Sequence, residues 1–316
     1  LALPIGGFSG LGGVIYTLAH LGVLWDRPAL LQEAESLADN ALISAEQDER
    51  FDLISGAAGW IGSLISLYFC TRSDQVKAAA IESGDWLIAR AQPMGRGIGW
   101  VQKVAGTRPL AGFSHGAAGI AWALLELASL TGEKRFQAAA LKAIAYERSL
   151  FSPAARNWPD LRHHENSDGT KNDSQDIFLT TWCHGAPGIG LARLRSLKQL
   201  DEPAVKEEIA VALETTFAKG FGRNHSLCHG DLGNIELLFQ AGETFDDPQW
   251  RHQVKHLAGI VLESISRDVW LCGNPLFAQS PGLMTGLAGI GYGLLRLAEP
   301  KRVPSVLVLE PPPLQV

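Results

Sequence analysis

The chain has few charged side chains and no excess of positive charge. Among its 316 residues, 27 Lys and Arg are outnumbered by 33 Asp and Glu, which gives a formal net charge of -6. Proteins that bind nucleic acid present clustered positive charge, so we expect no nucleic-acid partner. Because 46% of the residues are hydrophobic, the chain can form a globular protein with one large core or two ordinary ones.

Long hydrophobic runs and a secretory signal are also missing. The apolar stretches are interrupted by Gly, Arg, Glu or Ser before they reach the roughly 20 residues that span a bilayer. The opening residues 1–4 lack the basic segment and cleavage site of a signal peptide. These features predict a cytoplasmic protein. The first residue is not methionine, and we expect the sequence to be a piece of a longer chain.

Cysteine is sparse, with only Cys70, Cys183, Cys228 and Cys272. Four thiols in a chain of this length are too few for a disulfide scaffold and are typical of a reducing compartment. Cys70 and Cys272 are interpreted as small buried hydrophobic side chains. The other two lie within a repeated motif, which changes their interpretation.

Glycine, by contrast, is abundant and follows a repeated pattern. Gly-x-x-Gly precedes an apolar segment six times, with first glycines at Gly10, Gly56, Gly116, Gly185, Gly230 and Gly286. The following segments, such as residues 60–69 and 120–130, are apolar on all sides, which is typical of a buried helix. Charged amphipathic segments alternate with them and predict outer helices with one wet face. These segments are residues 28–43, 75–91, 134–150, 203–221 and 249–267.

The alternation of inner and outer helices predicts an all-α protein. Repeated helical pairs either stack into an open solenoid or close into a ring, and buried inner helices favour the closed α/α toroid. Glycine at each inner-helix start lets backbones approach closely and permits positive φ in the turn. If all inner helices start at the same end, the six turns converge on one rim, where the helix N-termini carry partial positive charge. We expect one domain over residues 1–316, without the outer helix that should precede the first turn.

Two long connections interrupt the pattern, at residues 92–110 and 151–181. The second is polar, and we interpret it as a surface loop, with a lid or a substrate-docking loop as the alternative. The chain ends in a short extended segment and a proline-rich tail.

Residue types that bind metals recur at one position of the repeat. Histidine precedes the first glycine as His115, His184 and His229, and cysteine precedes two of these as Cys183 and Cys228. Thiolate and imidazole suit Zn²⁺, and a catalytic zinc keeps three protein ligands and one open position. We therefore predict a zinc site formed by Cys183, Cys228 and His229.

The charge of this ligand set indicates the reaction. Two thiolates and a neutral imidazole leave the zinc site formally neutral, so a third thiolate from a substrate makes it anionic. The bound sulfur then stays deprotonated and electron-rich. This favours alkylation of a thiol over activation of water.

Three further residues lie near the turns. His115 has no cysteine beside it and is a candidate acid or base near the metal, because the pKa of histidine lies close to neutral pH. Asp52 either orients a catalytic group or stabilises a helix N-terminus as a carboxylate. His184 is either a rim residue or a hydrogen-bond donor that supports the metal ligands.

The combined motifs resemble those of the lanthionine cyclase family. They are Trp182-Cys183-His184-Gly185-Ala186-Pro187-Gly188-Ile189, Cys228-His229-Gly230 and Gly112-Phe113-Ser114-His115-Gly116-Ala117-Ala118-Gly119. The segment SPGLMTGLAGIGYG at residues 280–293 is similar to the C-terminal cyclase domain of class II, bifunctional lanthionine synthetases. The resemblance covers essentially the whole chain.

This resemblance implies an α/α toroid of seven helical layers and Zn²⁺ bound by Cys183, Cys228 and His229. The implied substrate is a dehydrated ribosomal precursor peptide, whose cysteine thiolates add to dehydroalanine or dehydrobutyrine to form lanthionine or methyllanthionine rings. In this scheme His115 is the acid/base residue that protonates the resulting enolate, and Asp52 is a further active-site residue. The implied partners are an N-terminal dehydratase domain, absent from this sequence, and an exporter at the membrane.

One departure from the family and three alternatives accompany this interpretation. Stand-alone members carry an Arg shortly before the first zinc cysteine, whereas this chain has FLTT at residues 178–181, so the group that stabilises the enolate is unassigned. A protein prenyltransferase β-subunit uses Asp with Cys and His, which the motif Trp-Cys-x-Gly-x-Pro-Gly argues against. An α/α-toroid glycosidase needs paired carboxylates, and only Asp52 and Asp231 lie near the turns. The third alternative is a non-catalytic, zinc-containing glutathione- or peptide-binding scaffold.

Overall fold

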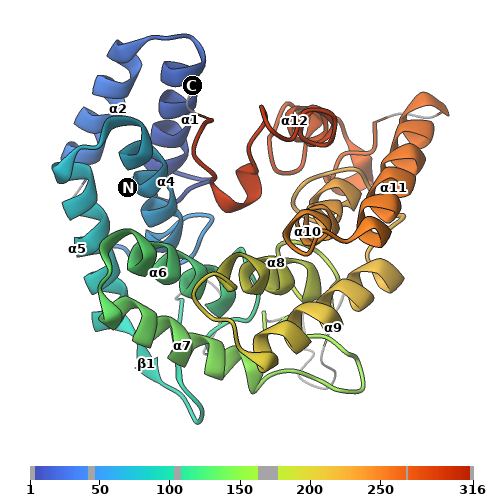
Figure 1. The fold of residues 1–316 in the computed structure, drawn as a ribbon, viewed down its shortest axis with the longest axis horizontal. Coiled ribbons are helices and arrows are strands. Elements are labelled where there is room, and N and C mark those ends of the chain that lie inside the picture. Colours follow the sequence, from blue (N-terminus) through green and yellow to red (C-terminus); the bar gives the residue numbers. More distant parts are fainter. Residues whose placement is uncertain (1–3, 42–46, 103–107, 163–176, 268–269, 314–316) are drawn as a thin grey trace. The chain divides into compact units, whose positions relative to one another are not determined.

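The computed structural model of the chain is almost entirely helical (Figure 1). It describes residues 4–41, 47–102, 108–162, 177–267 and 270–313. Two compact units are distinguished: unit 1 lies within residues 1–150, 161–177 and 304–316, and unit 2 within residues 151–160 and 178–303. The single domain expected over residues 1–316 stays a prediction. In the described part of the chain, every helix is too short or too polar to cross a membrane.

Unit 1 is built from helical hairpins. They are α1 (Leu11–Leu24) with α2 (Pro28–Asn40), α4 (Ala57–Thr71) with α5 (Asp74–Arg90), and α6 (Ala117–Thr131) with α7 (Lys134–Arg148). The first helix of each pair follows a glycine turn, and α4 packs against both α1 and α6. Helices α4 and α6 are buried on all sides over most of their length, as the apolar segments predicted.

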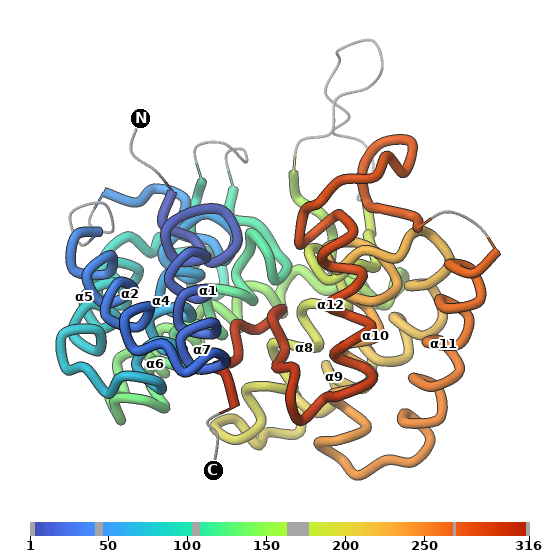
Figure 2. The backbone as a smooth tube through the Cα atoms, turned by 90° about the horizontal axis from the view of Figure 1, so that it is seen from above, coloured from blue at the N-terminus to red at the C-terminus, as the bar shows by residue number. Residues whose placement is uncertain are grey.

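Unit 2 repeats the same arrangement, as the hairpins in Figure 2 show. Its helices are α8 (Ala186–Ser196), α9 (Pro203–Lys219), α10 (Asp231–Thr244), α11 (Pro248–Arg267) and α12 (Leu287–Ala298), with the 3₁₀ turn η1 (Pro275–Phe277) before α12. The inner helix α10 packs against α8 and α12. Proline begins the outer helices α9 and α11, where its missing N–H and fixed φ suit the first helical position.

The structure adds detail to the first predicted connection and corrects part of the second. Residues 92–110 contain a short antiparallel ribbon of β1 (Gln92–Pro93) and β2 (Ile98–Gly99). The surface-loop prediction for residues 151–181 is wrong at its start, because Asn157 and Trp158 are buried. This start of the connection is therefore part of the packed interior, although the composition of the whole connection is polar. The predicted lid or docking loop falls mainly on residues 163–176, which lie outside the described residues.

Each of the six Gly-x-x-Gly motifs opens an inner helix, with its first glycine as the N-cap residue. The predicted positive φ is correct for Gly10 and Gly185, but φ is close to -120° at the other four. Close approach explains glycine there instead. A Cβ at Gly116 would lie 2.3 Å from the carbonyl carbon of Ala111. The turn folds back onto its own helix start, and this leaves no room for a side chain.

The first and last inner helices are less buried than predicted. Val14 in α1 is 47% exposed, and Leu295 in α12 is 58% exposed. The helices between them, α4, α6, α8 and α10, each have buried residues on all sides. Burial on every side is therefore wrong for α1 and α12. The seventh helical layer implied by the family resemblance stays a prediction.

The C-terminal segment packs into unit 1 instead of extending from it. Residues 306–309, which include the 3₁₀ turn η2 (Val306–Val308), are buried. The Tyr16 hydroxyl donates a 2.8 Å hydrogen bond to the Glu310 carbonyl oxygen, and His20 Nε2 lies 3.1 Å from the same oxygen. Two aromatic side chains of α1 therefore hold the tail through the Glu310 carbonyl. Their rings are tilted by 38° and their centroids lie 4.1 Å apart.

This attachment predicts acid sensitivity. Burial lowers the pKa of His20 from 6.5 to about 4. Between those two pH values the unfolded chain binds a proton that the folded chain does not, so stability falls as the pH falls from 6.5 to about 4. The pKa difference of about 2.5 units sets an upper limit of about 3.4 kcal/mol on this loss. Thermal unfolding of the His20→Gln variant should show a flatter pH dependence over this window. His252→Gln, at an exposed position on α11, should keep the wild-type slope, and equal slopes for all three proteins would contradict the prediction.

Candidate metal centre and histidine–aspartate pair

Backbone hydrogen bonds join consecutive glycine turns within each unit. In unit 2, Cys183 N–H donates to the Cys228 carbonyl at 3.2 Å, and Cys228 N–H donates to the Met284 carbonyl at 2.8 Å. In unit 1, Leu53 N–H donates to the Ser114 carbonyl at 3.1 Å. The predicted convergence of turns is therefore confirmed within each unit, where residues far apart in sequence become neighbours.

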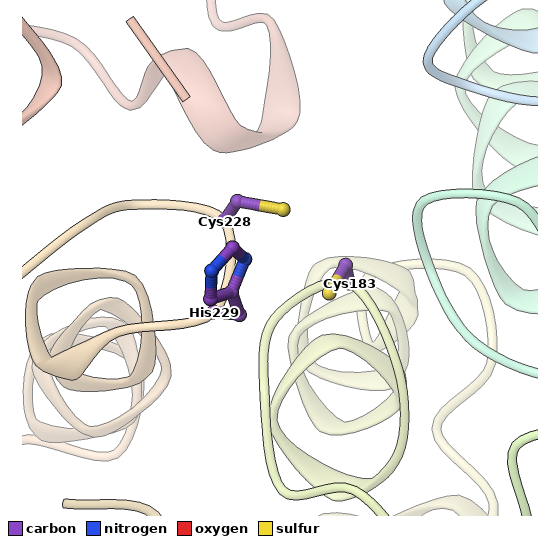
Figure 3. Close-up of side chains that lie close together, drawn as sticks. All are labelled: Cys183, Cys228 and His229. Carbon is purple, nitrogen blue, oxygen red and sulfur yellow. The ribbon is translucent and has the colours of Figure 1, made fainter. Parts of the chain in front are cut away.

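The turn before α8 and the turn before α10 bring the three predicted metal ligands together. The Cys183 and Cys228 Sγ atoms and one ring nitrogen of His229 all lie within 4.8 Å of one another. Figure 3 shows Cys228 and His229 projecting from one turn and Cys183 from the other. None of the four cysteines in the chain forms a disulfide. Adjacent residues point to the same centre here because they lie in a turn and not on a regular strand.

A backbone carbonyl selects which nitrogen of His229 faces the cluster. Nε2 lies 2.8 Å from the Gly273 carbonyl oxygen, and because a carbonyl only accepts, Nε2 carries the proton. The lone pair is then on Nδ1, which is the atom left to bind a metal. Ligating histidines are usually fixed in this way by a carbonyl or carboxylate on the other nitrogen.

The donor set and its spacing fit Zn²⁺. With Zn–S bonds of about 2.3 Å in a tetrahedron, two sulfurs lie roughly 3.8 Å apart, which is within the observed limit of 4.8 Å. Cys183 is 9% exposed, and Cys228 and His229 are half-buried, so a fourth ligand can reach the centre from solvent. Two thiolates and one imidazole match a soft, four-coordinate metal better than Mg²⁺ or Ca²⁺, which prefer oxygen.

Replacement of Gly273 should weaken metal binding although all three proposed ligands are retained. A Cβ there would lie 2.7 Å from His229 Nε2 and 2.6 Å from Ser226 Oγ, so Gly273→Ala must displace the imidazole. Loss of a partner behind a ligand costs roughly 10–100-fold in metal affinity, and chelator competition should show a fall of that size. Gly291→Ala is the matched control, because a Cβ there meets nothing within 4 Å. Equal zinc affinity for the two variants would contradict the assigned role of Gly273.

In unit 1, the turn before α6 brings His115 to Asp52 in the turn before α4. His115 Nδ1 lies 2.7 Å from Asp52 Oδ2, and the side chains are 33% and 4% exposed. Asp52 Oδ1 also accepts a 2.6 Å hydrogen bond from Ser55 N–H. The carboxylate is thus held in place, and of its two predicted roles the geometry matches the orienting one.

This pairing determines what His115 can do chemically. Because the carboxylate accepts from Nδ1–H, Nε2 is the ring nitrogen left to exchange a proton. Gln102 Nε2 donates a 2.6 Å hydrogen bond to the His115 carbonyl, which fixes the backbone of the turn. The pair therefore has the geometry of an oriented general acid or base.

His184 and Asp231 are close in sequence to the three clustered residues, but their side chains contact other residues. The His184 ring is buried, with Nδ1 3.8 Å from Asp160 Oδ1, so it packs into the core and is not a rim residue. Asp231 Oδ1 accepts from Gly222 N–H at 3.0 Å at the start of α10, and burial raises the pKa of its carboxyl to about 6. Asp231 thus links the backbone at Gly222 to the first residue of α10.

A set of buried polar side chains that hold the turns was not predicted from the sequence. Glu147 Oε1 accepts from Gly112 N–H and Ala118 N–H, at 2.9 and 3.2 Å. Asp48 and Asn157 accept from the first N–H of α4 and α8, at 2.9 and 2.8 Å. These residues occur outside the glycine motifs, at no fixed spacing from them. Their only sequence signal is a polar side chain within an otherwise apolar surrounding.

Comparison with known proteins identifies one family model that matches nearly the whole chain. It is described as lanthionine synthetase C-like protein, and it matches residues 3–308. Nisin cyclase has a similar structure, with a TM-score of 0.72 and 18% identity over 97% of this chain and 80% of that chain. This likeness confirms the predicted fold class, an all-α protein of the α/α toroid type.

Two relatives are similar in sequence. The lacticin 481/lactococcin biosynthesis protein LcnDR2 of Lactococcus lactis subsp. lactis is 29% identical over 211 residues, which is 63% of this chain and 22% of that protein. The glutathione S-transferase LANCL1 of Danio rerio is 23% identical over 264 residues, or 79% of this chain and 60% of that protein. The chain therefore spans less than two thirds of either relative.

Proposed function

Because the family model matches residues 3–308, the chain belongs to the lanthionine synthetase C-like family, and we propose that it is a zinc-dependent cyclase. The reaction is the addition of peptide cysteine thiols to dehydroalanine or dehydrobutyrine, which gives lanthionine or methyllanthionine rings. The single observation that carries this proposal is the cluster of Cys183, Cys228 and His229, in which Cys183 is buried and the other two residues are half-buried. Likeness to a nisin cyclase and to a lacticin biosynthesis protein supports it.

The proposed mechanism begins with the residues that would hold the metal. Cys183 and Cys228 would supply two thiolates, and His229 would supply Nδ1 because Gly273 retains the proton on Nε2. When bound, zinc supplies Lewis acidity that lowers the pKa of a thiol joining it, so that a thiolate nucleophile is present at neutral pH. The Thr181 hydroxyl lies 3.3 Å from Cys183 Sγ, where it would donate a hydrogen bond to the thiolate.

His115 is proposed as the acid that completes the addition. As the sulfur forms its bond to the β-carbon, the electrons of the carbon–carbon double bond move into an enolate. His115 then delivers a proton from Nε2 to the α-carbon, while Asp52 balances the positive charge of the ring before the transfer. The thiol proton released at the start balances the proton that is consumed, so no other reactant is needed.

The direct test is incubation of the purified, zinc-loaded protein with a dehydrated precursor peptide. We expect loss of alkylatable thiols, counted by mass spectrometry after treatment with an alkylating reagent. Ring formation adds no mass by itself, so each ring appears as one missing adduct. A zinc-loaded protein that leaves all peptide thiols reactive would exclude the cyclase proposal.

The remaining components of the pathway are proposals that follow from the substrate. A dehydrated peptide requires a dehydratase that removes water from Ser and Thr, and this activity would come from an N-terminal domain or a separate partner. The modified peptide would then be passed to an exporter at the membrane. We place the reaction in the cytoplasm, where cysteine thiols of both enzyme and substrate stay reduced.

The relative named glutathione S-transferase LANCL1 favours one second candidate function at the same centre. The thiol of glutathione would occupy the open position in place of a peptide cysteine, either as a reactant or as the ligand of a non-catalytic scaffold. Incubation with glutathione and a dehydroalanine peptide that has no cysteine distinguishes these cases. A glutathione adduct on the peptide would support transfer, and glutathione binding without an adduct would support the scaffold.

A further inference from the structure

The loop before α12 presents apolar side chains to solvent. Residues 270–295 contain no charged residue and no histidine. At the tip of this loop Leu276 is 98% exposed and Phe277 is 50% exposed. Both have left-handed backbones, with φ of 56° and 54°, a conformation that bulky residues rarely adopt. Strained residues of this kind are concentrated at binding and catalytic sites.

The base of the loop holds this tip in position. Asn274 Nδ2 donates to the Ala278 carbonyl at 3.0 Å and to Ser280 Oγ at 2.8 Å. Asn274 Oδ1 accepts a 3.0 Å hydrogen bond from Thr285 Oγ1, and its carbonyl accepts from Phe277 N–H at 2.9 Å. The two apolar side chains are therefore presented by an ordered turn, and little entropy is lost when they bind a ligand.

Both ends of the loop contact the metal ligands directly. Gly273, the residue before Asn274, accepts from His229 Nε2, and Met284 accepts from Cys228 N–H. Leu276 follows Gly273 by three residues, so their Cα atoms lie at most about 11 Å apart. With the carbonyl and the 2.8 Å contact to His229 added, the Leu276 Cα lies within about 20 Å of the metal centre, a distance that about six extended peptide residues span.

We propose that Leu276 and Phe277 dock a hydrophobic side chain of the peptide that lies within about six residues of the reacting cysteine. This inference rests on the proposed function and names a determinant of its substrate specificity. The uncharged loop matches an uncharged peptide segment, because dehydroalanine, dehydrobutyrine and the thioether product carry no charge. The position of the tip limits the docked residue to the segment within about six residues of the cysteine.

Two other occupants fit the loop less well. A stable dimer needs about 800 Å² of surface from each partner, whereas two side chains supply at most roughly 400 Å². Attachment to an anionic membrane relies on Lys and Arg, and residues 270–295 contain neither. A single extended peptide needs only the small contact that the tip provides.

The test uses the double variant Leu276→Asn/Phe277→Asn, because Asn tolerates the left-handed backbone and removes the apolar surface. The probe is a synthetic uncharged peptide with one dehydroalanine and one cysteine, in which leucine occupies the other positions within about six residues of the cysteine. We expect KM to rise about tenfold or more, with kcat and zinc content unchanged. For a peptide with serine in place of leucine, the wild type and the variant should have the same KM.

Leu262→Gln is the matched control, since it removes a side chain that is 50% exposed on the outer helix α11. It should leave KM unchanged. The inference is overturned if the double variant keeps the wild-type KM, loses zinc, or differs from the wild type only in self-association or in sedimentation with phosphatidylserine vesicles. If the wild type forms no ring, the proposed function fails. Fluorescence anisotropy of the same labelled peptides then tests docking separately, with weaker binding by the double variant expected and equal binding contradicting it.

Discussion

Replacement of Cys183 by Ala is expected to abolish ring formation and to remove most of the bound zinc. The side chain is one of three ligands within 4.8 Å of each other, and an ion with two remaining protein ligands is held far more weakly. Because even partners behind the ligands change metal affinity by 10–100-fold, loss of a ligand should lower it by more than about 100-fold. Metal analysis of the purified variant and the thiol-alkylation assay measure the two effects.

Cys70→Ala is the control for this prediction. Burial raises the pKa of the Cys70 thiol to about 11, so this residue is neither a thiolate nor a ligand at neutral pH. The control should keep zinc and ring formation close to the wild-type values. If Cys183→Ala retained full zinc and full ring formation, the metal centre would have to lie elsewhere.

The second large effect is expected from His115→Asn. This variant should retain zinc, whose three proposed ligands are untouched, but kcat should fall roughly 10²–10⁴-fold, the range attributed to general acid–base catalysis. Asp52→Asn should also lower kcat, by up to about 10⁴-fold, because the amide can present N–H to Nδ1 and favour the wrong tautomer of the imidazole. Steady-state ring formation on a dehydrated peptide, with zinc content measured in parallel, checks both variants.

A pH profile separates a chemical role from a structural one. The wild-type rate should depend on pH, and His115→Asn should lose part of that dependence. The matched control is His256→Asn on α11, where the side chain is exposed, and its profile should follow the wild type. A His115→Asn enzyme with normal kcat and a normal pH profile would exclude this histidine as the acid.

The inner helices and the Cys–Cys–His cluster could be predicted because the same Gly-x-x-Gly motif marks the helix starts and follows the Cys and His residues. Gly-x-x-Gly marks the start of each inner helix, so a cysteine or histidine just before it must lie in a turn. The convergence of Cys183 with Cys228 and His229 then followed from the repeat, and the observed cluster has those three members. The enzyme class predicted from the motifs is supported by the family match over residues 3–308.

The interactions that were not predicted join residues with no fixed spacing. Gly273 lies 44 residues after His229, and Glu147 lies 35 residues after the Gly112 N–H that it accepts from. Such pairings depend on how hairpins pack and not on local pattern. Positive φ was also an incorrect explanation for glycine at four of the six N-caps. Glycine is needed there because another backbone segment lies where a Cβ would be, and the sequence does not show which segment that is.

The contact between His229 and Gly273 bears on when the chain would acquire the proposed metal. All three ligands are synthesised by residue 229, but the carbonyl that directs Nδ1 toward them belongs to a segment that leaves the ribosome later. A nascent chain that ends before this segment has the sulfurs and the imidazole without the selected tautomer. Loading of the proposed metal should therefore be a late event in biosynthesis, after the segment that contains Gly273 has folded against His229.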